Sequence, residues 1–246
     1  MIIHDFEHPL NEKTRIYLRV ESLLNQIQLS ADLTDQLHYL IFFRSLFDLA
    51  EIVEQVQLKS EIAQDIEKQR QIYRYWRNID GVDQERLEQL LHEVDSIYRL
   101  LLNTERFGQQ IKDDRFLNMI RQRFGLPGGT CSFDLPILHY WKQQPIEQQK
   151  QATQAWLNSF LPLQKALNLL LKLTRESSDF HHYEATAGFF QSMADEATLL
   201  RLHIPAEHNA YPVISGNKSR FAIKFIHFTS AQACTQNIEF QLAICR

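Results

Sequence analysis

The hydrophobic period of the chain changes near residue 176, and this change limits the folds that the chain can adopt. Before it, apolar residues recur at the spacing of one buried helix face, as in Ile16, Val20 and Leu24. After it, apolar and polar residues alternate, as in Ile238, Phe240 and Leu242, which is typical of strands with one buried face. The sequence therefore predicts an α+β protein, with a predominantly helical bundle domain and a smaller antiparallel β-domain.

The first residues of the chain also read as a strand. Residues 2–7, IIHDFE, are short and partly β-branched, and a single short strand is not stable without a sheet to join. We expect this segment to pair with the C-terminal strands. The predicted domains are therefore an α-helical domain of residues 10–177 and a β-strand domain of residues 1–9 and 178–246.

Several elements inside these domains follow from the same pattern. One helix is predicted from about residue 104 to 124, and another has Pro145 in its first turn. Strands are predicted at residues 197–205, 219–229 and 237–245, with a strand and turn at 211–217. In the strand predicted at residues 237–245, Ile244 lies on the buried face and Ala243 on the exposed face.

The composition excludes several classes of protein. The chain has 246 residues, is 44% hydrophobic and has a net charge of −4, which gives no overall attraction to nucleic acid. Its three cysteines have no paired spacing, so a reducing compartment is expected. The N-terminus lacks the features of a secretory signal, and the apolar runs are too short to span a bilayer. We expect a cytoplasmic protein without membrane insertion.

Glycine is concentrated at residues 125–129, which hold three of the seven glycines of the chain. The segment lacks the spacing of a phosphate-binding loop. Cys131 beside it has no evident histidine and carboxylate or amide partners for nucleophilic catalysis, although His139 is near in sequence. The histidines of the chain show no metal-ligand spacing. We therefore expect no enzyme activity, no cofactor and no metal, and a sharp turn or a plain connection at the glycines.

The strand at residues 219–229 offers the most informative charged surface. Arg220 and Lys224 share one face with Ala222 between them, and aromatic residues occupy the opposite face. Residues 197–246 contain five cations and two anions, a local charge of +3. This face is either an ordinary solvated surface or a patch that recognises an acidic peptide or a phosphate. Nucleic-acid binding is less favoured, because Phe221 and Phe225 point away from the cations.

The helix that precedes the glycines is also basic. Residues 106–124 contain five cations against Asp113 and Asp114, and Arg115 and Arg123 lie on roughly the same side. A surface helix with internal salt bridges and a second basic contact surface both remain open.

Three blocks of sequence resemble the ZapD family of Z-ring-associated cell division proteins. They are FEHPLNEK at residues 6–13, RQRFGLPGGTCSFDLPILHYW at residues 121–141 and ISGNKSRFAIKF at residues 214–225. Gly81, Val82, Asp83 and Gln84, with Arg86, fit the same family. The blocks occur in the order and at the spacing of the family, so the resemblance covers the whole chain.

This resemblance implies a function without enzyme activity. Members of the family bind the C-terminal tail of FtsZ as homodimers and cross-link FtsZ filaments, which stabilises the Z ring at mid-cell. The alternative is a nucleic-acid-binding module that uses the same basic strand. The resemblance implies that FtsZ is contacted by a set of basic residues at the matching positions, which here are Arg19, Arg115, His139, Arg220 and Lys224. Lys224 stands where other members can have arginine, so the charge is kept without the bidentate fork.

The glycine segment then has a geometric interpretation. A sharp turn at residues 125–129 would let Arg115 before it and His139 after it face one site beside the strand with Arg220.

Overall fold

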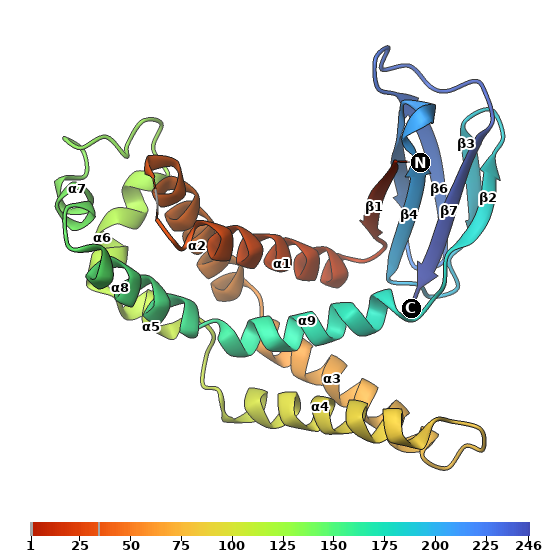
Figure 1. The fold of residues 1–246 in the computed structure, drawn as a ribbon, viewed down its shortest axis with the longest axis horizontal. Helices are drawn as coiled ribbons and strands as arrows, with labels where there is room; N and C mark the ends of the chain where they lie inside the picture. The colour runs from red at the N-terminus through yellow and green to blue at the C-terminus, as the bar shows by residue number, and fades with distance from the viewer. Residues whose placement is uncertain (1, 34) are drawn as a thin grey trace. The chain divides into compact units, whose positions relative to one another are not determined.

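The computed structural model describes residues 2–33 and 35–246, and it confirms the predicted α+β fold (Figure 1). The α-helices lie within residues 12–175, and the strands lie within residues 3–9 and 181–245. The helices are α1 (Glu12–Ser30), α2 (Gln36–Gln55), α3 (Leu58–Trp76), α4 (Gln84–Asn103), α5 (Gln109–Asp113), α6 (Arg115–Phe124), α7 (Pro136–Lys142), α8 (Ile146–Asn158) and α9 (Leu161–Arg175). The strands are β1 (Ile3–Pro9), β2 (His181–Ala185), β3 (Phe189–Met193), β4 (Leu199–Pro205), β5 (Ala210–Gly216), β6 (Arg220–His227) and β7 (Ile238–Cys245), with a short 3-10 helix η1 (Ala206–His208) after β4.

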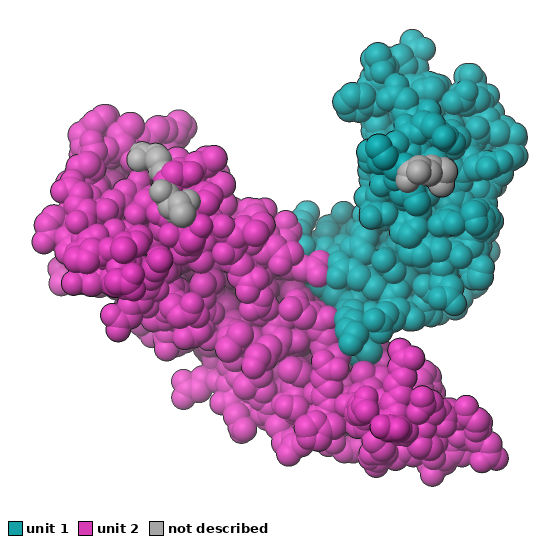
Figure 2. All heavy atoms as spheres, in the orientation of Figure 1, with its two compact units in different colours: residues 1–19, 171–246 teal, residues 20–170 magenta. Residues whose placement is uncertain are grey.

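The chain divides into two compact units, which Figure 2 shows in different colours. Residues 1–19 and 171–246 form one unit, here called the β unit, and residues 20–170 form the helical unit. Helices α1 and α9 each pass from one unit into the other, so these bounds fall inside helices. The predicted domain boundaries, next to residues 10 and 177, follow the change between strand and helix and stay a prediction.

The β unit contains two antiparallel sheets. Sheet A has the strand order β1-β4-β7-β2, and sheet B has the order β3-β6-β5. The N-terminal strand β1 pairs along its whole length with β4, from Ile3 opposite Pro205 to Pro9 opposite Leu199. The prediction that the N-terminal segment joins the C-terminal strands is therefore confirmed.

The two sheets share one hydrophobic core. Leu202 of β4, Phe240 of β7 and Phe225 of β6 are all almost fully buried in the same cluster of side chains. Alternate residues of each strand point to this core, which is the arrangement of a sandwich of two sheets. The sequence pattern had indicated a small sheet, and the structure divides its strands between two.

Sheet A is covered on its other face as well. Leu199, Ala243 and Cys245 are fully buried there, against Leu18 of α1 and Phe180. The prediction that Ala243 lies on an exposed face of β7 is therefore wrong, because α1 covers that end of the strand.

The two short strands β2 and β3, which a tight turn joins and which belong to different sheets, were not predicted. Each strand is only five residues long, and β2 has the polar sequence HHYEA. Ala187 and Gly188 join them with φ values of 48° and 69°. Two consecutive positive φ angles are typical of the tight turns that connect antiparallel strands.

The helical unit is built around aromatic rings. Phe43 of α2 is fully buried, with the ring of Trp141 in α7 at 5.5 Å and that of Trp156 in α8 at 5.9 Å. Phe116 of α6 lies 6.1 Å from Phe43 and 5.4 Å from Trp141. Four helices that are separate in the sequence therefore converge on one core.

The predicted helix from residue 104 to 124 is wrong, because the chain forms two helices there. Gly108 has a φ of 67° before α5, and the indole Nε1 of Trp156 donates a hydrogen bond of 2.8 Å to Oδ2 of Asp114. Asp114 separates α5 from α6, and its Oδ1 accepts a hydrogen bond of 2.9 Å from the backbone N–H of Leu117. Asp114 thus begins α6 as an N-cap.

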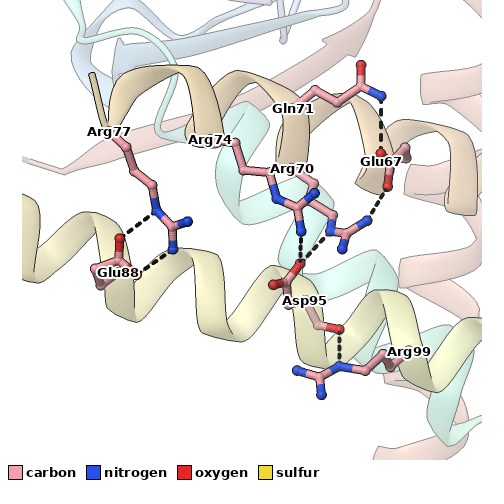
Figure 3. Close-up of polar contacts among 8 residues, drawn as sticks. All are labelled: Glu67, Arg70, Gln71, Arg74, Arg77, Glu88, Asp95 and Arg99. Atoms are coloured by element: carbon pink, nitrogen blue, oxygen red, sulfur yellow. Dashed lines mark hydrogen bonds and ion pairs between the residues drawn. The ribbon is translucent and has the colours of Figure 1, made fainter. Parts of the chain in front are cut away.

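Helices α3 and α4 form an antiparallel hairpin with charged side chains between them (Figure 3). Arg70 donates to Asp95 across the pair and to Glu67 on its own helix at 2.9 Å, which holds the pKa of Glu67 below its ordinary value. Arg77 forms two hydrogen bonds of 2.6 Å to Glu88. Partly exposed pairs of this kind contribute about 0.2–1 kcal/mol each, so the buried apolar residues of the two helices supply most of the stability of the hairpin.

The glycine segment between α6 and α7 is a series of tight turns. The N–H of Leu126 donates to the carbonyl oxygen of Arg123, and the N–H of Gly129 donates to that of Leu126. A Cβ atom at Gly129 would overlap the carbonyl oxygen of Arg123, whereas a Cβ at Gly125 would meet only the carbonyl oxygen of Gln122, at 3.7 Å. The close approach of the backbone to itself therefore requires glycine at position 129.

We expect Gly129→Ala to lower the free energy of unfolding of the helical unit by about 1–3 kcal/mol, because the turn must open to admit the methyl group. Gly125→Ala is the matched control, and it should leave the stability within about 0.5 kcal/mol of the unchanged protein. Urea denaturation followed by tryptophan fluorescence measures both. Equal stability of the two variants would contradict the role of Gly129.

Candidate functional site

The outward face of β6 has the arrangement that the alternation predicts. Arg220 and Lys224 are exposed, with the partly exposed Ala222 between them. Phe221 and Phe225 on the other side of the strand are 3% and 0% exposed and belong to the core of the β unit. The two cations therefore stand on an open sheet surface.

Neighbouring strands add apolar side chains to this surface. Phe189 of β3 and Val213 of β5 lie opposite Lys224, and Met193 of β3 lies opposite Arg220. Directly opposed residues of antiparallel strands share a face, so these side chains lie beside the cations. Phe189, Val213 and Met193 are 47%, 50% and 63% exposed. We call the outward face of sheet B the cation face; it consists of Phe189, Gln191, Met193, Tyr211, Val213, Ser215, Arg220, Ala222, Lys224 and Ile226.

The turn before β6 fixes the backbone position from which the Arg220 side chain extends. Oδ1 of Asn217 accepts hydrogen bonds from the N–H groups of Ser219 and Arg220, at 2.9 and 3.3 Å. The N–H of Asn217 donates to the carbonyl oxygen of Arg220 at 2.9 Å. Gly216 allows the turn to close, because a Cβ there would meet Cβ of Phe221 at 2.6 Å. Arg220 is thus held by its backbone, while its guanidinium has no hydrogen-bond or ion-pair partner among the residues that the structure describes.

The cations of the β unit differ in whether they are paired. Lys218 lies 2.9 Å from Glu196, Arg201 lies 3.4 Å from Glu7, and Arg246 lies 3.5 Å from Asp195. In the part of the chain that the structure describes, Arg220 and Lys224 form no ion pair. Their charge is therefore available to an outside ligand.

Arg19 is exposed on α1, within the β unit. Its neighbour Leu18 packs on Leu199, on the side of sheet A that faces away from sheet B. Arg220 is on the outer side of sheet B. Within the β unit the structure thus places Arg19 and Arg220 on opposite faces.

Arg115 and His139 are both exposed residues of the helical unit. Arg115 is the first residue of α6, and His139 lies on α7 with its Nε2 atom 2.8 Å from Nε2 of Gln143. The neighbouring rings of Phe116 and Trp141 pack 5.4 Å apart, so α6 and α7 are joined close to both residues. A site shared by Arg115, His139 and Arg220 stays a prediction.

The apolar part of the cation face was not predicted from the sequence. Phe189 and Met193 come from a strand that was not predicted, and Val213 comes from a strand whose register was not predicted. The signal that could have found them is the short Thr186-Ala-Gly segment followed by FFQSM, a tight turn followed by an alternating strand.

The structure also bears on cysteine chemistry, metal binding and membrane insertion. Cys234 and Cys245 are buried, which raises the pKa of both thiols, and Cys131 is exposed. Within residues 2–33 and 35–246, no group of three or more histidine, cysteine, aspartate and glutamate side chains is placed to hold a metal ion. No helix in those same ranges combines the length and the apolar character needed to cross a bilayer.

Comparison with known proteins shows the family of the chain. The family described as ZapD, a cell division protein, matches residues 18–224. The cell division protein ZapD of Vibrio atlanticus is 60% identical over 245 residues, which cover 100% of both chains. The protein of the same name from Vibrio parahaemolyticus is 59% identical with the same coverage, and that of Photobacterium profundum is 51% identical over 98% of both chains. The matches span nearly the whole chain, so this protein belongs to the ZapD family of cell division proteins.

Proposed function

We propose that this cell division protein binds the C-terminal tail of FtsZ and cross-links FtsZ filaments, which stabilises the Z ring during septum assembly. The observation that supports the proposal most is that Arg220 and Lys224 both stand on the open cation face and form no ion pair with any residue that the structure describes. In this proposal the protein acts in the cytoplasm at mid-cell, as a homodimer and without enzyme activity. Arg19, Arg115 and His139 stay predicted contacts of the same filaments.

The charge of the face suits a tail with acidic and apolar residues. A charge-assisted hydrogen bond contributes about 1.5–3 kcal/mol when it is partly shielded from water, and an exposed ion pair contributes less. One tail on one protomer is therefore held weakly. A symmetric dimer presents two sites, and filaments present many tails, so that linked weak contacts add up to stable cross-links.

Nucleic-acid binding is the second candidate, and one feature of the face favours it. Phe189 and Tyr211 are exposed on the same face as Lys224, and single-stranded nucleic acids stack bases on such aromatic rings. Unlike Phe221 and Phe225, which point into the core, these two rings are exposed to solvent. The net charge of −4 opposes this candidate, since nucleic-acid affinity comes mostly from phosphate contacts.

Co-sedimentation with polymerised FtsZ separates the two candidates. We expect the protein to pellet with full-length FtsZ and to stay in the supernatant with FtsZ that lacks its C-terminal tail. Raising the salt from about 50 to about 300 mM should reduce the pelleted fraction, because salt screens contacts between exposed charges. A mobility-shift assay with single-stranded and duplex DNA at the same ionic strength is the control. Pelleting that does not depend on the tail, or a DNA shift without pelleting, would contradict the proposal.

A further inference from the structure

The side chains of the cation face differ in size as well as in charge, which gives the face an uneven surface. Its side chains lie in rows that cross the three strands of sheet B. One row contains Met193 and Arg220, and another contains Phe189, Lys224 and Val213. The row between them contains Gln191, Ala222 and Ser215, which are polar or small. The middle row is therefore lowest at Ala222 and Ser215, where it forms a shallow trough between two rows of long or bulky side chains.

A pocket deepens one end of this trough. It has a volume of about 590 Å³ and lies between Met193 on one strand and Ser215 and Gly216 on another, with Arg220 and Ala222 in its lining. A cation and an apolar side chain thus line the same small space.

The apolar side chains are too exposed to be parts of the core. Met193, Val213 and Phe189 stay 63%, 50% and 47% exposed, although they lie on one face of the sheet. Covering them with an apolar ligand removes their surface from water, which favours binding. It also shields Arg220 and Lys224 from water, and contacts between charges are stronger when the surrounding side chains exclude water.

We infer that the cation face recognises a short extended peptide whose acidic residues alternate with or adjoin apolar residues, and that Met193 and Phe189 bind the apolar ones. This inference rests on the proposed function, with the tail of FtsZ as the peptide. The main chain of the peptide lies along the trough, where the amide of Gln191 and the hydroxyl of Ser215 offer hydrogen bonds to it.

The dimensions of the face agree with an extended peptide. Arg220 and Lys224 are four residues apart on one strand, which separates their rows by about 13 Å. Successive side chains of an extended peptide point to opposite sides, so a peptide in the trough sends them alternately to the Arg220 row and to the Lys224 row. Each row supplies a cation and an apolar neighbour to the side chains that reach it.

Addition of the peptide as an extra strand fits the face less well. β5 is an edge strand of sheet B, and it contains Pro212, which has no N–H to donate to a new strand. β3, the other edge, is five residues long. Recognition by the face therefore uses side chains, in agreement with their exposure.

Fluorescence anisotropy with a labelled peptide of the FtsZ tail tests the inference on the full-length protein. We expect Met193→Ala and Phe189→Ala each to weaken binding about five- to tenfold, as is usual when an apolar anchor of an interface is truncated. The dependence of the dissociation constant on salt should not change in these variants, because no charge is lost. Arg220→Gln should weaken binding and also reduce the salt dependence. Leu29→Ala, which truncates a side chain of α1 that is 79% exposed and distant in sequence from the cation face, should bind as the unchanged protein does.

A second peptide, with its acidic residues kept and its apolar residues replaced by serine, completes the experiment. It should bind the unchanged protein more weakly, and Met193→Ala and Phe189→Ala should weaken it no further, because the partner of each side chain is already missing. The inference would be overturned, and the proposed function would stand, if two results were found together. Met193→Ala and Phe189→Ala would bind the peptide as tightly as Leu29→Ala does, and Arg220→Gln would bind it more weakly. Unchanged binding by Arg220→Gln as well would overturn the proposed function.

Discussion

We expect Arg220→Glu to remove this protein from FtsZ pellets and to leave its fold intact. The substitution replaces a cation at the pocket of the cation face with an anion, so that the proposed contact with an acidic tail becomes repulsive. We expect the affinity for the tail to fall at least about a hundredfold, which corresponds to about 2.7 kcal/mol. Filament bundling should be lost completely, because cross-linking by the proposed dimer requires both of its sites to be occupied at once.

The matched control for this variant is Lys218→Glu. It changes the net charge by the same amount and lies in the turn before Arg220, but Lys218 is already paired with Glu196 at 2.9 Å. If the overall charge of the region drives binding, both variants fail to pellet. If the cation face is specific, only Arg220→Glu fails. Both positions are exposed, so the thermal unfolding of each variant should differ little from that of the unchanged protein, with changes within about 0.5 kcal/mol. Normal bundling by Arg220→Glu would show that the tail binds elsewhere.

The largest loss of stability is expected for Phe43→Ala. Phe43 is fully buried and has six aromatic rings within 6.2 Å, those of Phe42, Phe47, Phe116, Phe124, Trp141 and Trp156. Truncating such a side chain leaves a cavity among rigid rings that cannot move together to fill it. We expect a loss of about 3–5 kcal/mol in the free energy of unfolding of the helical unit.

Phe133→Ala is the control for Phe43→Ala, because its ring is 81% exposed in the segment between α6 and α7. It should unfold at the same urea concentration as the unchanged protein. Tryptophan fluorescence reports on the helical unit in particular, since all three tryptophans lie within residues 20–170. A loss below about 1 kcal/mol for Phe43→Ala would mean that the aromatic core is able to repack.

The sequence predicted those parts of the fold in which the residue pattern of a single strand or helix shows which of its faces is buried. Alternation along residues 220–225 was enough to place Arg220 outside and Phe221 inside, because the side-chain period of a strand is two. The helix over residues 104–124 was predicted wrongly because no proline marks the break and the charged residues around it also suit the surface of a helix. Only Asp114, as an N-cap, and Gly108, with its positive φ, mark the point where the chain turns.

The part of the site that could not be predicted depends on pairing between distant segments. Lys224 gains Phe189 as a neighbour through a strand 35 positions earlier in the chain, and gains Val213 through another. A shift of one residue in either register would turn these side chains to the opposite face. The pairing is decided by the common core of the two sheets, which the sequence of β6 alone does not specify.

The pairing of β1 with β4 has a consequence for how the protein is made. β1 is synthesised first, yet its partner β4 begins at Leu199, and β7, which lies between β4 and β2 in sheet A, begins only at Ile238. Contacts between such distant segments form slowly, because a long loop must be closed before they are gained. Helices within residues 20–170 can fold on the ribosome before β4, the partner of β1, has been synthesised. Sheet A is complete only when β7 has been synthesised, so a chain that stops early lacks the core on which the cation face rests.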